Sequence, residues 1–420
     1  MIRRTQRRIQ RRLPRCAAGF SLVELLVAMA IGLVVTLAIT SVVIRSEGSK
    51  RSSTSVNDIN QSGAYAAYVL DRTIRSAGSG FSQRWAEVYG CRLDVSRGST
   101  HILPLASPLP STSAFTDLPL NLRLAPFVIG KGFADTTGAG AEVRGDVLIV
   151  MGGTAGVGEL PQTVLPGSVI ATTPASLRLP NTLGYRSGDL VLLADTGVVG
   201  GCMLQQVGTR SATEYGQTLA LAGTYFGATG TGVNLADFGA ATVALQLGRH
   251  PENPPQFTAF GVGADRTLMS YDLLQPLPAG GGAPDSPIAD GVVEMRAVYG
   301  VDTTSPPDGA LDGWVDASGS YSAANLTDGS AAAASRLRQI VAVRVGLIMR
   351  TSLQERAPSS SASSVVGTET YGQATGTQIR LFNDLPSAVR YTRTLATGEL
   401  NYRFRTVEVT IPLRNVLMAP

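Results

Sequence analysis

The residue best placed to do chemistry is Glu24, the only charged residue in an apolar run of 25 residues, FSLVELLVAMAIGLVVTLAITSVVI (20–44). An ionised carboxylate inside a nonpolar zone costs about 2–3 kcal/mol, so it needs a partner or a function. A cut between Gly19 and Phe20 would create an α-amine four residues before Glu24. That amine could neutralise the carboxylate of the same chain or of a neighbouring subunit. The competing interpretation is a carboxylate that reaches out to the membrane interface.

A second group of carboxylates lies in the loop 301–317, which is rich in Asp, Pro and Gly. Several carboxylates crowded in a flexible loop can bind Ca²⁺ through their oxygens. Their spacing differs from that of a helix–loop–helix calcium site, and Asx turns in a solvated loop are the simpler interpretation. The calcium candidates are Asp302, Asp308, Asp312 and Asp316. We expect no other cofactor.

The chain contains three cysteines. Cys16 lies near the N-terminus, before the apolar run. Cys91 and Cys202 remain as an even pair in what should be an oxidising compartment, where a disulfide is one interpretation and two separate buried thiols are the other. The sequence alone does not establish that the two side chains approach each other.

No pattern of residues predicts catalysis. The only histidines are His101 and His250, and neither has the spacing of a metal-binding pair. No Gly-x-Ser-x-Gly nucleophile motif occurs, and the glycine clusters at 152–158 and 227–232 lack the Lys-Ser/Thr ending of a phosphate-binding loop. We therefore expect a protein that is not an enzyme.

The apolar run and the residues before it predict a membrane anchor. Seven arginines and no acidic residue lie in 1–19, which places the N-terminus in the cytoplasm. As a helix, 25 residues rise roughly 37 Å, enough to cross a bilayer core. An ordinary secretory signal would have a small-residue cleavage site after the run, and an organellar transit peptide would leave Glu24 unexplained. The C-terminal part then lies outside, in the periplasm if the cell has two membranes.

The basic character of the chain comes from its first residues. Without the seven arginines, the 35 basic residues fall to 28 against 31 acidic residues, a net charge of −3. The rest of the chain is therefore mildly acidic, and its charge gives no support for nucleic-acid binding.

Apolar residues recur at steps of three and four from Val56 to Ala77, which predicts that the helix continues beyond the membrane. Gly78 and Gly80 end the pattern. We expect one helix from about residue 20 to 77, loosened around 46–55.

The remaining sequence, rich in its 47 Gly and 23 Pro, suits a β protein with many loops. Irregular loops and short strands are expected over 81–142, and a mobile Ser/Thr/Gly-rich loop over 359–376. A helix followed by a strand is expected at 331–349. The predicted strands are 145–150, 188–193, 202–207, 218–221, 242–247, 267–271, 292–299 and 403–413.

The stretch Gly19-Phe20-Ser21-Leu22-Val23-Glu24 resembles the prepilin signal of type IV pilins and type II secretion pseudopilins. The resemblance implies that prepilin peptidase cuts after Gly19 and methylates Phe20, and that Glu24 aids docking of the subunit in a filament. Two features depart from the family pattern: the leader is long, and the helix-breaking proline often found in such anchors is absent.

Scattered pieces further along resemble the PilW-type minor pilins. They are 70–78, the two Gly-Asp strands at 145 and 188, 290–295 with 299–302, 340–350, and 402–405 with 413–415. The resemblance implies an α+β, type IV pilin-like fold, in which a long N-terminal helix with a transmembrane first half packs on a mainly antiparallel β domain with large loop insertions. The implied parts are a cleaved leader 1–19, a transmembrane and filament-core helix 20–44, an amphipathic continuation 45–80 and an extracytoplasmic domain 81–420.

The function implied by the resemblance is that of a minor pilin in the inner membrane and then in a pilus, supporting assembly and hence twitching motility, adhesion or DNA uptake. Its implied partners are prepilin peptidase, major and minor pilins, the inner-membrane assembly platform, and membrane lipid before assembly. A large pseudopilin of a type II secretion system and a tip-borne adhesin remain alternatives.

Overall fold

The computed structural model describes residues 19, 21–111, 113–137, 141–155, 161–195, 201–211, 217–278, 282, 284–354, 369–371, 378–399 and 402–418. The predicted leader up to residue 18, Phe20 and most of the predicted mobile loop 359–376 lie outside the described residues. The chain divides into two compact units, Met1–Thr54 and Ser55–Pro420, which are described separately.

Helix α1 runs without a break over Leu22–Arg75. The predicted loosening around 46–55 is wrong. This stretch contains no proline, and an ion pair between Glu47 and Arg51, 3.3 Å apart, supports the helix at i,i+4 spacing. In the apolar first unit, Thr36 Oγ1 donates to the carbonyl of Gly32 at 2.7 Å, and Thr40 donates likewise to Thr36. These hydroxyls are satisfied within the helix, as nonpolar surroundings require.

In the second unit, the last turns of α1 pack through one face. The buried residues are Ile59, Ala66, Leu70, Ile74 and Ala77, which confirms the predicted amphipathic pattern. Gly63 lies on the same face, where an added Cβ would come within 3.0 Å of a Val407 methyl group. A small residue is therefore needed for this close approach.

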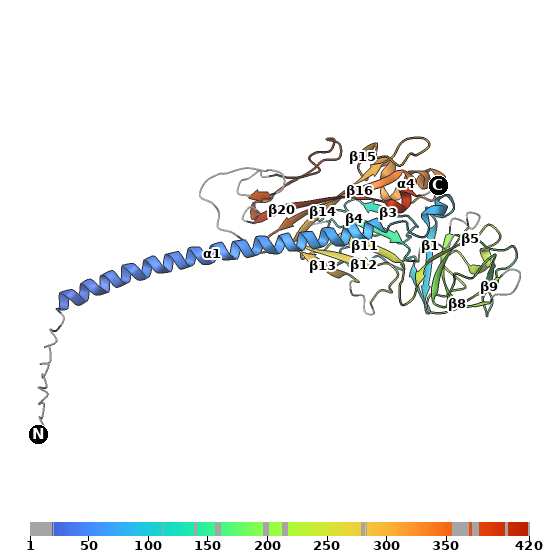
Figure 1. Cartoon of the computed structure of the whole chain (residues 1–420), viewed down its shortest axis with the longest axis horizontal. Coiled ribbons are helices and arrows are strands. Elements are labelled where there is room, and N and C mark those ends of the chain that lie inside the picture. The colour runs from blue at the N-terminus through green and yellow to red at the C-terminus, as the bar shows by residue number, and fades with distance from the viewer. Residues whose placement is uncertain are drawn as a thin grey trace, which may run out of the picture. The chain divides into compact units, whose positions relative to one another are not determined.

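Three sheets and a two-stranded ribbon make up the second unit (Figure 1). The first sheet has the order β2-β1-β8-β7-β10-β5, with β9 paired to β8 and β6 paired to β9. Its strands are β1 (Arg92–Arg97), β2 (Thr100–Leu103), β5 (Gln162–Thr163), β6 (Ser176–Leu179), β7 (Asp189–Ala194), β8 (Gly201–Ser211), β9 (Gln217–Leu221) and β10 (Val243–Arg249).

The other two sheets have five strands each. The second has the order β13-β12-β11-β4-β3 and the third β15-β14-β16-β20-β17. The second contains β3 (Phe127–Gly130), β4 (Val147–Gly152), β11 (Gln256–Val262), β12 (Thr267–Asp272) and β13 (Ser286–Asp290). The third contains β14 (Val292–Val301), β15 (Gly313–Val315), β16 (Ile340–Arg350), β17 (Glu369–Tyr371) and β20 (Arg403–Pro412), and the ribbon pairs β18 (Gln378–Leu381) with β19 (Tyr391–Thr394).

Short helices fill the connections. They are α2 (Trp85–Val88), α3 (Ala323–Leu326), α4 (Ala331–Gln339) and α5 (Arg414–Leu417), with 3₁₀ turns at Ser82–Arg84, Leu235–Asp237, Gly319–Tyr321 and Thr397–Glu399. Helix α4 leads directly into β16, which confirms the predicted helix-then-strand. Ser330 caps α4 by accepting a hydrogen bond from the backbone N–H of Ala333.

Among the named strands that the structure describes, the pairing is antiparallel apart from β1 and β8, which run parallel. The α+β architecture with a long N-terminal helix and a mainly antiparallel domain is therefore as the sequence predicts. The predicted strands occur, with β4 and β7 each ending beyond the predicted residue. Strand β11 was missed, although it forms the centre of the second sheet between β4 and β12.

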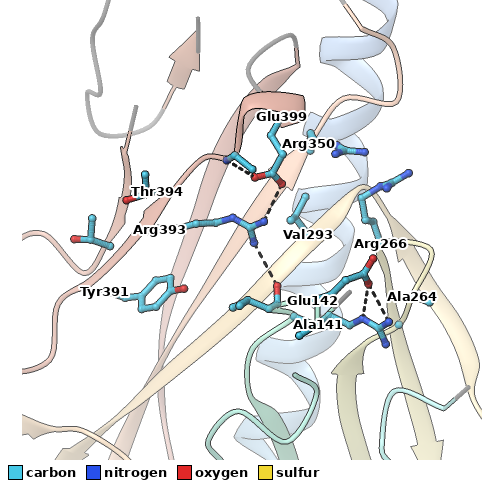
Figure 2. A pocket seen from close by; sticks show the side chains of 15 residues that line it. Ala141, Glu142, Ala264, Arg266, Val293, Arg350, Tyr391, Arg393, Thr394 and Glu399 are labelled. Carbon is cyan, nitrogen blue, oxygen red and sulfur yellow. Dashed lines mark hydrogen bonds and ion pairs between the residues drawn. The ribbon is translucent and has the colours of Figure 1, made fainter. Parts of the chain in front are cut away.

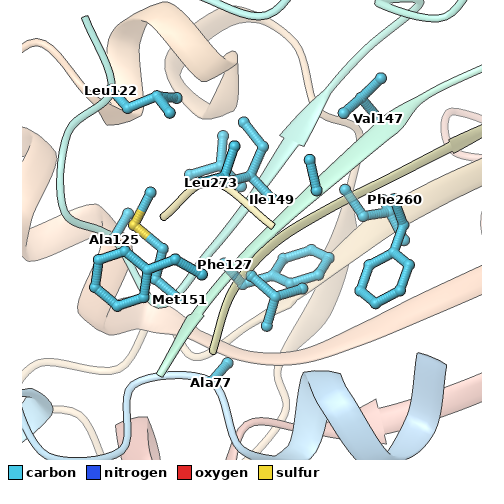
Figure 3. Close-up of a cluster of buried hydrophobic side chains, with 14 of the residues drawn as sticks. Ala77, Leu122, Ala125, Phe127, Val147, Ile149, Met151, Phe260 and Leu273 are labelled. Carbon is cyan, nitrogen blue, oxygen red and sulfur yellow. The ribbon is translucent and has the colours of Figure 1, made fainter. Parts of the chain in front are cut away.

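The main core lies where α1, the first strands and the second and third sheets meet. Figure 3 shows one part of it, in which Ala77, two residues after the end of α1, lies below Phe127 of β3 and Met151 of β4. The first sheet has a smaller core of its own, formed by Leu177, Leu193 and other buried side chains. The described residues between Val164 and Ala244 therefore pack around a hydrophobic core of their own.

Candidate functional site

The predicted processing and assembly residues lie at the start of α1. Gly19 is exposed and precedes the helix, whereas Phe20 is outside the described residues. Glu24 lies in the first turn of α1, and its side chain is exposed. A carboxylate in a first turn is favoured by the positive end of the helix dipole. The structure thus leaves Glu24 accessible to an incoming positive group.

The first unit exposes an apolar surface. Fifteen large apolar side chains between Leu22 and Ile44 are each 49–74% exposed. The helix is long and apolar enough to cross a membrane, with a mean hydropathy of 2.6 over its most apolar 18 residues. Burial of each such side chain is worth about 1.5–3 kcal/mol, so this surface requires lipid or the apolar helices of other subunits around it.

A disulfide joins Cys91 and Cys202, whose Cα atoms lie 5.6 Å apart. Cys91 immediately precedes β1, and Cys202 lies in β8 opposite Leu93. The bond therefore fastens the one parallel strand pair, whose strands come from segments 111 residues apart.

The calcium candidates do not converge. Both oxygens of buried Asp302 accept backbone N–H groups, from Thr304 and Gly309. Asp312 accepts from the backbone and side chain of Thr303, and these hydrogen bonds lower the pKa of Asp312.

The two remaining carboxylates of this loop are also engaged. Asp308 accepts from the N–H of Ala310, and Asp316 pairs with Lys131. Among the described residues, no group of three His, Cys, Asp or Glu side chains could hold a metal ion. The carboxylates instead fix the shape of their loop through Asx-type bonds.

The two histidines lie apart. His101 Nδ1 is 3.1 Å from Ser96 Oγ, and the His250 ring meets the edge of Tyr225 with centroids 5.1 Å apart. Burial lowers the pKa of His250, with a further contribution from Arg97.

The strongest electrostatic feature is a buried charge cluster centred on Glu294 of β14, which is 0% exposed. Its Oε1 accepts from Arg296 Nε at 2.7 Å, and its Oε2 accepts from Arg393 Nη1 at 2.8 Å. Arg296 also binds Asp146 at 3.0 Å, and Arg393 also binds Glu399 at 2.8 Å. The carboxylates of Glu294, Asp146 and Glu399, with that of Asp135 at 3.9 Å from Arg296, thus surround two guanidinium groups and tie β14 to β19 and to the loop before β4.

The turn before β4 requires both residues of the Gly145-Asp146 dipeptide. Gly145 has a φ of +105°, and a Cβ there would lie 1.9 Å from the carbonyl oxygen of Met295. Only glycine allows this approach. Asp146 then accepts hydrogen bonds from the backbone N–H groups of Gly132 and Ala297, which holds β4 against β14.

Beside the charge cluster lies a pocket of about 520 Å³, drawn in Figure 2. Tyr391 forms part of its wall, and burial raises the pKa of Tyr391 to about 12, so the phenol stays neutral near the Arg296 guanidinium 4.6 Å from its ring. The charged residues of the wall are Arg144, Arg266, Arg350, Arg393, Glu142 and Glu399. None of them could be identified from the sequence, because they come from four separate segments, 142–144, 266, 350 and 393–399, and no local spacing links them.

Two protein-family models match parts of the chain. The model described as Type IV Pilus-assembly protein W matches residues 260–415, and the Prokaryotic N-terminal methylation motif matches residues 14–40. The two matches together support a PilW-type minor pilin of type IV pili. No curated protein and no solved structure matches the chain.

The two matches fall on the two features already described. The methylation motif covers Gly19, Phe20 and Glu24 together with the exposed apolar part of α1. The PilW match runs from the end of β11 to α5, and so includes Glu294, Arg393 and the third sheet. The first sheet lies outside it. PilW-type proteins are structural, pilus-associated proteins that associate with other pilins and the assembly machinery, and this chain is anchored in the membrane in that context.

Proposed function

We propose that this PilW-type protein is made as a prepilin in the inner membrane, with its N-terminus in the cytoplasm and its β domain in the periplasm. Prepilin peptidase cuts between Gly19 and Phe20 and methylates the new N-terminus. The leader 1–19 is then lost, and residues 20–44 leave lipid for the core of a pilus. The observation that carries this proposal is the apolar surface of Leu22–Ile44, exposed around the whole helix and preceded by the cleavage motif.

We also propose a place at the tip or in the priming complex of the pilus. The extracytoplasmic part, 81–420, has roughly 340 residues, which would crowd a closely packed shaft. The folded first sheet adds bulk beyond the part that the PilW model covers. At this place the protein is present in few copies and supports pilus assembly. Through assembly it supports motility, adhesion or DNA uptake. The pseudopilin of a secretion system has the same N-terminal motif, but the PilW match over 260–415 favours the pilus.

Replacement of Glu24 by alanine is expected to leave cleavage intact and to lower incorporation into pili by about tenfold or more. The α-amine of Phe20 would then have no carboxylate to pair with during docking, and losing an ionic partner in a nonpolar zone is worth about 2–3 kcal/mol. The measurement is the amount of mature protein in sheared pili relative to the membrane fraction, by immunoblot.

Glu47→Ala is the matched control, since Glu47 is an exposed carboxylate of the same helix whose ion-pair partner in the described part of the chain is Arg51. Its incorporation should equal that of the unmodified protein. Normal incorporation of Glu24→Ala would show that the amine–carboxylate pairing does not drive assembly.

A further inference from the structure

Two arginines at the pocket of Figure 2 differ from all other charged groups on its wall. Glu142 binds Arg144 at 2.9 Å, and Glu399 binds Arg393 at 2.8 Å, so these four charges are matched. Arg266 and Arg350 are left. No dashed line reaches either side chain in Figure 2, and neither has an ion pair with any described residue.

Arg350 is the more unusual of the two. It ends β16, is only 9% exposed, and lies over the Tyr402 ring at 3.9 Å from the ring centroid. Its Nε is buried without a hydrogen-bond partner among the described residues. Burial lowers the pKa of Arg350, and the charge of Arg266 lowers it further. A buried guanidinium without a carboxylate is costly, and contact with the aromatic face compensates only part of that cost.

Arg266 comes from the turn between β11 and β12. It has a φ of +57°, a conformation that glycine adopts without strain and other residues adopt rarely. Its exposed side chain reaches the same wall as Arg350, and the two guanidinium groups lie side by side in Figure 2. An arginine therefore occupies a position of this turn whose backbone conformation favours glycine.

The acidic groups near the two arginines do not neutralise them. Asp58, Asp265 and Asp290 line an adjoining pocket of about 460 Å³, which shares Arg266 and Arg350 with the first. None of these carboxylates forms an ion pair with either arginine, and Asp290 instead accepts from Thr267 Oγ1. On the 520 Å³ side, the unmatched charge of the wall is positive.

We infer that Arg266 and Arg350 form a binding site for an oxyanion, the carboxylate or phosphate group of a small molecule whose remaining atoms occupy the 520 Å³ pocket. Guanidinium groups bind such planar or tetrahedral oxyanions through paired N–H donors. The pocket lies within the size range of small-molecule sites. The oxyanion would accept hydrogen bonds from the Nη groups of Arg350 and screen the repulsion between the two cations. The inference does not depend on the proposed role in the pilus.

The test is calorimetric titration of the full-length chain in detergent micelles, at low ionic strength, with inorganic phosphate and separately with acetate. Sodium chloride at matched ionic strength is the reference. Saturable binding of phosphate alone points to a phosphorylated ligand, saturable binding of acetate alone to a carboxylated one, and binding of both to a site that takes either. The inference is overturned if neither anion gives saturable heat above the chloride reference.

Variants assign the binding to these residues. Arg266→Gly and Arg350→Gln are each expected to weaken binding by about tenfold or more, the loss typical of one hydrogen-bonded charge. Arg186→Gln, an equal charge change at an exposed arginine of the turn before β7, should bind as the unmodified chain does. If Arg350→Gln fails to fold, Arg266→Gly decides, because glycine suits the positive φ and should leave the melting temperature unchanged or higher. Unaltered binding in Arg266→Gly would place the anion elsewhere.

Discussion

Replacing Glu294 by glutamine is expected to lower the free energy of unfolding by about 3–5 kcal/mol, the usual cost of removing one partner from a buried ion pair. The carboxylate is fully buried, and each of its oxygens accepts from a different arginine. Glutamine keeps the size of the side chain but removes the charge. Arg296 would keep Asp146 and Arg393 would keep Glu399, but each guanidinium would lose its fully buried partner, and the NH₂ group of glutamine would face one of them.

The measurement is chemical denaturation of the full chain in micelles, followed by tryptophan fluorescence. Glu142→Gln is the matched control, because Glu142 also pairs with an arginine, Arg144, but its side chain is 57% exposed. Exposed pairs contribute about 0–1 kcal/mol. Equal losses in the two variants would mean that the cluster around Glu294 does not hold β14 and β19 together.

Removing the disulfide is expected to cost about 3–5 kcal/mol. A bond that closes a loop of 111 residues restricts the unfolded chain strongly, and it also fastens the parallel pair β1 and β8, which no hairpin connects. Alanine suits both positions, since Cys91 and Cys202 are 7% and 0% exposed. The double variant should unfold at lower denaturant, and a reductant should bring the unmodified protein to the same midpoint.

Cys16→Ala is the control for this experiment, because Cys16 precedes the predicted cleavage site and the disulfide uses both other cysteines. Its denaturation midpoint should match that of the unmodified chain. The account of β1 and β8 would be wrong if reductant left the midpoint of the unmodified protein unchanged.

Features fixed by neighbouring residues could be predicted from the sequence. The apolar run and its arginine-rich flank predicted the first half of α1. The apolar residues at steps of three and four predicted the second half, and Gly78 predicted where the helix ends. The Gly-Asp pairs predicted the turns that precede β4 and β7. The first of these turns needs a positive φ at its glycine and a carboxylate that accepts hydrogen bonds from backbone N–H groups.

Features fixed by distant residues could not be predicted. The partners of Glu294 are Arg296 and Arg393, which lie 2 and 99 residues away in the chain. Asp146, which binds Arg296, lies 150 residues from it, and no local pattern encodes this arrangement. Strand β11 follows two prolines, which indicate a loop. It pairs with β4, which lies about 100 residues earlier in the chain. Asp302 and Asp312 are of a residue type that often binds metal ions, but their oxygens accept hydrogen bonds from backbone N–H groups of their own loop. Arg350 differs from a surface arginine only through its burial over Tyr402.

The central claim is that residues 19–44 are a processed anchor and that the rest of the chain is carried by it. Mass analysis of the N-terminus of the protein, purified from cells with and without prepilin peptidase, tests this most directly. The account predicts a mature chain that begins at methylated Phe20 when the peptidase is present, and an intact leader when it is absent. An intact Met1 in cells that contain the peptidase, or a cut after residue 44, would contradict it.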